Sequence, residues 1–185
     1  REMAKKFKLP LGKISESMEI CFIQMTINDF LKKYLKEKPG DIIDTGGKKI
    51  GGHKGLWFYT IGQRKGMKLP QGPYFVLEKN LNKNILIVTN NEKDLYKKEL
   101  VAKDVNWIAG KMPKLPLKAM VKIRYRQKAM PAIIKEYKKS RAKIIFLKSQ
   151  RAITPGQSVV FYSSVEARRA KADKNRELLG GGIIC

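Results

Sequence analysis

The sequence predicts a mainly β fold with some α: a small mixed α/β region, followed by an antiparallel all-β region. Hydrophobic residues make up 43% of the 185 residues, which is enough to bury a core. Only one segment, near residues 26–38, has a clear helical periodicity. After it, short apolar segments recur every ~8–12 residues between turn-forming residues, which is typical of an antiparallel sandwich or barrel.

The first half of the chain supplies the helix and two hairpins. Residues 20–23 are predicted as a short buried strand or a tight loop, and residues 26–38 as a helix that Pro39 and Gly40 end. The helix prediction rests on four apolar residues that share one helical face: Phe30, Leu31, Tyr34 and Leu35. Residues 41–44 and 48–50 flank one turn, and residues 74–77 and 85–88 flank another, so each pair predicts a hairpin.

The second half is predicted to consist of strands. They cover residues 100–108, 117–125, 131–137, 142–148, 158–162 and 178–184. In the second of these, Ala119, Val121, Ile123 and Tyr125 alternate with polar or larger residues, so we expect one face to point inward and Lys118, Lys122 and Arg124 to point outward. Residues 166–177 break the pattern and predict a solvated helix or loop, or a contact with RNA through their cations. The domain boundary is expected near residues 90–98.

Composition and sequence motifs exclude several classes of function. Forty Lys and Arg against sixteen Asp and Glu give a net charge of +24, so a polyanionic partner is expected, although a lysine-rich solvated surface could produce the same excess. No apolar run approaches the ~18 residues of a membrane span, and the start has no signal peptide. One histidine and two cysteines argue against a disulfide scaffold, a His-based triad or a multi-histidine metal site. No glycine-rich phosphate loop is present.

Two segments of the first half carry candidate chemistry. Residues 51–66 hold five glycines in sixteen positions, and the donors His53, Gln63, Arg64 and Lys65 could hold phosphate or a neighbouring domain. The alternative, favoured by composition alone, is a structural turn whose aromatic residues belong to the core. Cys21 lies between Ile20 and Phe22, a setting typical of an inert buried cysteine, whereas a functional one needs an accessible thiolate.

Two segments of the second half suggest contacts with nucleic acid. Arg124 and Tyr125 place a cation beside an aromatic ring, which suits phosphate binding and base stacking. Gln157 follows a Pro-Gly turn that would expose it to a base edge. A solvated strand end and a simple barrel turn are the structural alternatives.

Taken together, these segments resemble one family, the tRNA-specific 2-thiouridylases of the bacterial type. Five motifs occur in the order of that family and span nearly the whole chain. They are Ser17-x-x-Ile20-Cys21-Phe22, Gly52-His53-x-Gly55 with the run from Tyr59 to Gly66, the run from Lys122 to Gln127, Ala152-x-Thr154-Pro155-Gly156-Gln157, and the run from Leu179 to Ile184.

The resemblance implies an architecture of three parts: an ATP-pyrophosphatase domain, a small mixed α/β central domain and a C-terminal antiparallel β-barrel. This chain resembles the C-terminal half only. Residues 1–25 would be the tail of the missing ATP-pyrophosphatase domain with a cysteine loop, residues 26–97 the central domain, and residues 98–185 the barrel.

The resemblance also implies a reaction. The whole enzyme would use ATP and Mg to adenylate the C2 oxygen of the wobble uridine of tRNA, and a persulfide on Cys21 would then supply sulfur to C2. Arg124, Tyr125 and Gln157 match positions that contact tRNA, while His53, Gln63, Arg64 and Lys65 would support them. The expected partners are tRNA, a sulfur-donor or relay protein and the ATP-pyrophosphatase domain, in the cytoplasm. Two alternatives remain: a non-catalytic RNA-binding β-barrel module, and a lysine-rich domain that binds any polyanion.

Overall fold

The computed structural model describes residues 27–67, 69–70, 72–164 and 177–185. The chain divides into two compact units, residues 1–37 and residues 38–185. The first unit contains the helix α2, Ile27–Tyr34, which is shorter than the predicted helix over residues 26–38. Pro39 disfavours helical backbone at Lys38, the last residue of the predicted helix. No helix of the described residues is both long enough and apolar enough to cross a membrane.

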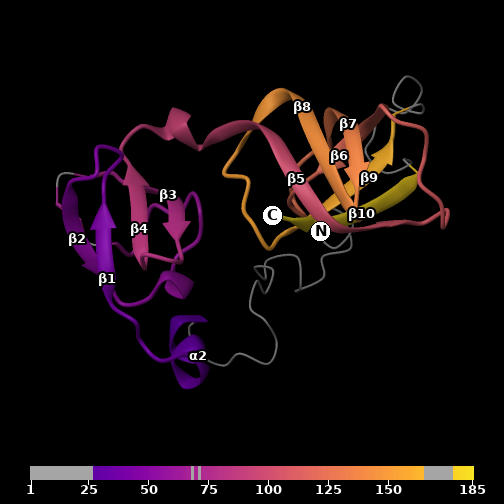
Figure 1. The fold of residues 1–185 in the computed structure, drawn as a ribbon. Helices are drawn as coiled ribbons and strands as arrows, with labels where there is room; N and C mark the ends of the chain where they lie inside the picture. Colours follow the sequence, from indigo (N-terminus) through magenta and orange to yellow (C-terminus); the bar gives the residue numbers. More distant parts are fainter. Residues whose placement is uncertain (1–26, 68, 71, 165–176) are drawn as a thin grey trace, which may run out of the picture. The chain divides into compact units, whose positions relative to one another are not determined.

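The second unit begins with a four-stranded sheet, which Figure 1 shows in indigo to magenta. Its strands are β1 Gly40–Ile43, β2 Lys49–His53, β3 Phe75–Asn80 and β4 Ile85–Thr89, in the order β2-β1-β4-β3. Both predicted hairpins are confirmed as antiparallel pairs. The parallel pairing of β1 with β4, which joins the two hairpins, was not predicted from the sequence.

A small core lies within this sheet and its connecting segments. The buried residues are Ile42, Leu56, Met67, Val76, Leu86 and Val88. Leu56 belongs to the short 3-10 helix η2, Leu56–Phe58, which lies inside the glycine-rich segment. Tyr59 packs against the same cluster, so part of that segment serves the core, as the structural alternative proposed.

A closed six-stranded barrel follows (Figure 1). The 3-10 helix η3, Glu92–Leu95, leads into it. Its strands are β5 Tyr96–Trp107, β6 Leu117–Lys122, β7 Met130–Lys138, β8 Arg141–Arg151, β9 Ser158–Ser163 and β10 Leu178–Ile184. They close in the order β10-β5-β8-β7-β6-β9, and neighbouring strands run antiparallel. The predicted mainly β fold with an antiparallel barrel is therefore confirmed, and the sandwich is excluded.

The glycine run of β10 explains how the barrel closes. A Cβ atom on Gly181 would lie 2.6 Å from the carbonyl oxygen of Val159, and one on Gly182 would lie 2.7 Å from that of Lys103. These distances are shorter than real Cβ contacts, so only glycine lets β10 fit between β9 and β5. The barrel core beneath is apolar and includes Phe146, Phe161, Ile134, Ile144 and Trp107.

Some predicted elements need correction or stand apart. The strand predicted over residues 117–125 ends at Lys122, while β5 begins at Tyr96, before the predicted residue 100. Residues 20–23 and the segment predicted as a solvated helix or loop, residues 166–176, lie outside the described residues. The domain boundary after residue 97 stays a prediction, because the sheet and the barrel belong to one compact unit.

Candidate RNA interface at one end of the barrel

Two loops that the sequence motifs singled out lie at the same end of the barrel. One joins β6 to β7 over residues 123–129, and the other joins β8 to β9 over residues 152–157. The ladder between β6 and β9 pairs Lys122 with Val160, so the end of β6 and the start of β9 are neighbours. We call these two loops together the motif end of the barrel.

A single backbone carbonyl connects the two loops. The Nη2 atom of Arg124 donates a hydrogen bond of 2.7 Å to the carbonyl oxygen of Ala152, although 28 residues separate them. The hydroxyl of Thr154 donates to the same oxygen at 2.9 Å. Ala152 is 1% exposed and has a φ of 51°, a left-handed conformation that costs an L-residue energy. Arg124 therefore holds a strained turn in place.

A second pair of side chains connects the first loop to the end of β8. The Nε2 atom of Gln127 donates to Oε1 of Gln150 at 2.7 Å, and Gln150 donates to the carbonyl oxygen of Lys148 at 2.7 Å. Gln150 is buried, and the backbone N–H of Gln127 donates to the carbonyl oxygen of Arg124 at 3.2 Å. Hydrogen bonds from the side chains of Arg124 and Gln127 thus hold this loop at two positions.

Tyr125 is the most exposed large hydrophobic residue among the described residues, with 93% of its surface accessible. The prediction that it shares the inward face of a strand is wrong, because β6 ends at Lys122 and Tyr125 lies in the turn that follows. Alternation of side chains between two faces holds only while the backbone remains extended. The ring is offered to solvent beside the exposed cationic residues Arg124, Arg126 and Lys128.

Gln157 closes a tight turn and exposes its side chain. Its backbone N–H donates to the carbonyl oxygen of Thr154 at 3.3 Å, and Gly156 has a φ of 86°, which identifies a type II turn with Pro155 at its second position. The carbonyl oxygen of Gln157 accepts from the N–H of Ile184 at 2.8 Å. The backbone is therefore fixed while the amide stays exposed, as the turn predicted.

His53 is placed inside the sheet and not at the motif end. It is 3% exposed, and its Nε2 atom donates to the carbonyl oxygen of Asn84 at 3.0 Å. The side chain of Asn84 in turn donates to the carbonyl oxygen of Pro39 at 2.7 Å. His53 therefore connects β2 to the β3–β4 turn, which is a structural contact.

Gln63 has a local structural task as well. Its Oε1 atom accepts from the backbone N–H of Thr60 at 2.9 Å, and its Nε2 atom donates to the carbonyl oxygen of Lys65 at 2.8 Å. Arg64 and Lys65 are exposed and border an open hollow of about 530 Å³ with Met67 and Tyr74. Only these two of the four supporting candidates present charge to solvent.

Sequence reasoning missed one contact of this region, between Lys79 and Tyr59. The Nζ atom of Lys79 donates to the carbonyl oxygen of Tyr59 at 2.9 Å. Burial lowers the pKa of Lys79 and raises the pKa of Tyr59, because burial disfavours the charged form of each group. A lysine on a strand carries no sequence signal that separates such a contact from a solvated side chain.

Cys21, the predicted sulfur carrier, lies outside the described residues. Within residues 27–67, 69–70, 72–164 and 177–185, no group of three or more His, Cys, Asp or Glu side chains is placed to hold a metal ion.

Comparisons with known proteins match the chain over both of its regions. Residues 28–90 match the tRNA methyl transferase PRC-barrel domain, and residues 97–184 match the aminomethyltransferase beta-barrel domain. The tRNA-specific 2-thiouridylase of Marinomonas sp. strain MWYL1 is 40% identical over all of this chain and 47% of the relative. Those of Buchnera aphidicola and Clostridioides difficile are 43% and 41% identical over all of this chain, covering 50% and 49% of the relatives. The chain spans about half the length of the curated relatives it matches.

Proposed function

Because the chain belongs to the family of bacterial-type tRNA-specific 2-thiouridylases, we propose that it is the tRNA-binding and sulfur-carrying portion of such an enzyme. The whole enzyme would thiolate C2 of the wobble uridine. Two features support this proposal: the relatives carry the name of that activity, and the motif end presents an aromatic ring and cations suited to RNA.

The reaction needs groups that this chain does not supply alone. The sequence contains no glycine-rich phosphate loop, so the proposal assigns ATP and Mg to a part of the enzyme outside this chain. Adenylation would turn the C2 oxygen into part of an AMP leaving group. A donor or relay protein would charge Cys21 with a persulfide, whose outer sulfur would attack C2 and expel AMP. A second cysteine thiol, outside this chain, would then attack Sγ of Cys21, so that the S–S bond breaks, a disulfide forms and one sulfur atom stays on C2. We place this work in the cytoplasm.

The observation that carries the tRNA-binding proposal is the fixed exposure of Tyr125. An aromatic ring that is 93% exposed gains nothing from folding, yet the bond from Arg124 to Ala152 and the pair of Gln127 with Gln150 hold its loop in place. A ring that is held but uncovered is a platform for an unstacked base. The amide of Gln157, on the neighbouring loop, has the donor and acceptor needed to read a base edge.

The test is binding of this chain to a tRNA with a wobble uridine, in competition with an RNA duplex, over a series of salt concentrations. Stacking on one base is worth ~1–3 kcal/mol, so Tyr125→Ala should weaken tRNA binding by roughly 5- to 150-fold and leave duplex binding unchanged. Tyr34→Ala is the matched control, because Tyr34 is also a well-exposed tyrosine, at 72%.

Two results would contradict the proposal. The first is equal binding of tRNA and duplex by the unmodified chain at physiological salt, which would make the charge of +24 a non-specific attraction. The second is a Tyr125→Ala variant that binds tRNA as tightly as the Tyr34→Ala control.

A further inference from the structure

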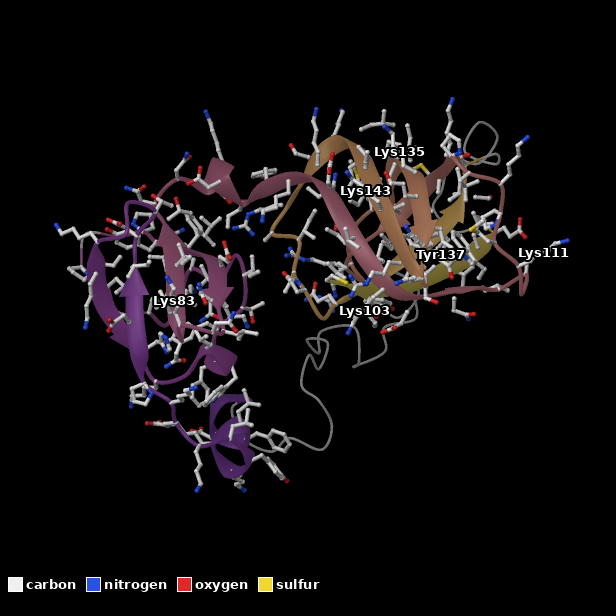
Figure 2. The ribbon with its side chains drawn as sticks, in the orientation of Figure 1. Lys83, Lys103, Lys111, Lys135, Tyr137 and Lys143 are labelled. Atoms are coloured by element: carbon white, nitrogen blue, oxygen red, sulfur yellow. The ribbon has the colours of Figure 1, made fainter. Side chains whose placement is uncertain are left out.

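A second cationic surface lies at the other end of β8. Three neighbouring strands carry outward-facing residues there, and the turn between β7 and β8 adds one more. We call this set the hairpin cation cluster; its members are Lys103, Lys138, Lys139 and Arg141, and all four are exposed. Figure 2 labels Lys103 and Tyr137, which mark this end of the barrel.

The strand register places like charges side by side. Lys138 of β7 pairs directly with Arg141 of β8. Ala142, next to Arg141, pairs with Ala102, next to Lys103, so Lys103 stands beside Arg141 on the third strand. Neighbouring strands are only ~4.8 Å apart, and like charges directly opposite each other destabilise a sheet. The row therefore costs stability unless an anion lies across it.

Three acidic residues lie near the row: Glu99, Glu136 and Asp104, which directly follows Lys103 in the chain. Glu99 forms an ion pair with Lys143, with 3.2 Å between the charged atoms. Glu136 lies opposite Lys143 in the strand register, one row away from the cluster. Within the part of the chain that the structure describes, no ion pair involves a member of the hairpin cation cluster. The cluster borders an open hollow of about 610 Å³, whose charged lining residues are Lys138, Lys139, Arg141, Lys143 and one carboxylate, Glu136.

The turn that carries the cluster is strained and rigid. Lys139 and Ser140 have φ values of 51° and 58°, which identify a type I′ turn, where Asn-Gly is the favoured pair. The carbonyl oxygen of Ser140 accepts from the N–H of Val105 at 3.1 Å, and the ring of Tyr137 lies 6.2 Å from that of Trp107. A lysine thus occupies a position of the turn that is costly for an L-residue, on a backbone that these contacts hold in place.

We propose that the hairpin cation cluster binds the phosphates of the RNA that the motif end reads, and this proposal rests on the proposed function above. The surface has no buried aromatic anchor of the kind that protein interfaces use, whereas a row of cations fits a phosphate backbone. β8 spans eleven residues from Arg141 to Arg151, about 33 Å at ~3.3 Å per residue. The bound RNA therefore extends at least along that length, close to one turn of a duplex.

The test compares two triple variants of the full chain with equal loss of charge. Lys138→Ala/Lys139→Ala/Arg141→Ala removes three of the four members of the cluster. Lys48→Ala/Lys83→Ala/Lys93→Ala removes three scattered, exposed lysines from the β1–β2 turn, the β3–β4 turn and η3 (Lys83 is labelled in Figure 2). Each lost phosphate contact lowers the slope of log K against log salt by ~0.7–0.9, so the cluster variant should lose about 2–3 from its slope on tRNA. The scattered variant should lose less than about 1.

A further variant separates the loss of phosphate contacts from a loss of folding stability. Lys139→Asn/Ser140→Gly supplies the favoured turn pair, so it should raise the thermal midpoint while it lowers the salt slope by about 1. A short RNA stem that spans well under 30 Å should bind the cluster variant and the unmodified chain with nearly equal slopes, because it cannot reach both ends of β8.

The outcomes separate this proposal from the proposed function. If the cluster variant keeps the slope of the unmodified chain on tRNA, the proposal is overturned, even if Tyr125→Ala weakens binding as expected. The same holds if the cluster variant loses only its binding to poly-L-glutamate, since the surface would then serve an acidic protein. If the cluster variant loses slope but Tyr125→Ala binds normally, the phosphate contact stands and the motif end does not read the RNA.

Discussion

Arg124 and Thr154 donate to the same carbonyl oxygen, so their removal should be strongly non-additive. In the described structure, these two donors lie 2.7 and 2.9 Å from the oxygen of Ala152. Ala152 is 1% exposed, and its own N–H donates to the carbonyl oxygen of Leu95 at 2.8 Å. This bond holds the peptide group that precedes the carbonyl, and the burial of Ala152 keeps water away from the carbonyl oxygen.

The magnitudes follow from how many donors each variant leaves. Arg124→Ala removes a hydrogen bond from a charged group, at the low end of ~1.5–3 kcal/mol because the side chain is exposed. Thr154→Val removes a neutral bond worth ~1 kcal/mol. Either single variant leaves one donor, whereas the double variant leaves a buried carbonyl without one, which costs a further ~1–3 kcal/mol.

The assay is urea unfolding of the four proteins of the cycle, with the free energy of unfolding taken from the linear extrapolation. Arg124→Ala combined with Ser164→Ala is the control, because Ser164 donates to Lys118 at the other end of β6. The control cycle should be additive within ~0.5 kcal/mol. Additivity in the cycle of Arg124 with Thr154 would refute the shared-acceptor argument.

Three other predictions test the fold and the site. Gly180→Ala places a Cβ against the carbonyl oxygen of Asn106 and should lower the free energy of unfolding by ~1–3 kcal/mol. Gly52→Ala is the control, because its Cβ would lie 3.6 Å from the nearest atom and should change that free energy far less. Urea unfolding measures both variants. Burial raises the pKa of Tyr59, so folding keeps its phenol neutral while the unfolded chain ionises near pH ~10. Stability should therefore fall as pH rises above that value, and Tyr59→Phe should reduce the fall measured by unfolding on either side of it. Cys21→Ser should abolish sulfur transfer to tRNA by the reconstituted whole enzyme, whereas intact transfer would support a non-catalytic RNA-binding module.

Most of the strands could be predicted because the barrel gives each one a buried and an exposed face. In β6, the predicted inward residues Ala119 and Val121 are 2% and 1% exposed. The prediction failed at Tyr125, because alternation in the sequence continues past the last ladder pair while the backbone turns. The parallel pairing of β1 with β4 was not predictable either, since it joins strands of different hairpins and no local turn encodes it.

The internal contacts of two predicted supporting residues were not predictable from the sequence. The sequence indicated donors for phosphate at His53 and Gln63, and the structure uses both for internal bonds. Composition cannot show this, because the acceptor of His53 is a carbonyl 31 residues away in sequence. The roles of Arg64, Lys65, Arg124, Tyr125 and Gln157 toward tRNA stay predictions.

At the motif end, the proposed tRNA binding and the stability of the loop would depend on the same residue, Arg124, for a physical reason. The exposed ring of Tyr125 contributes almost nothing to folding, so other groups must pay the entropy of ordering its loop. Arg124 does so through a bond to a buried carbonyl of the neighbouring loop, which also positions Gln157 five residues further along. A loss of tRNA binding in Arg124→Ala therefore combines a lost charge with a loosened loop. Tyr125→Ala carries neither effect, so it is the variant that measures recognition by itself.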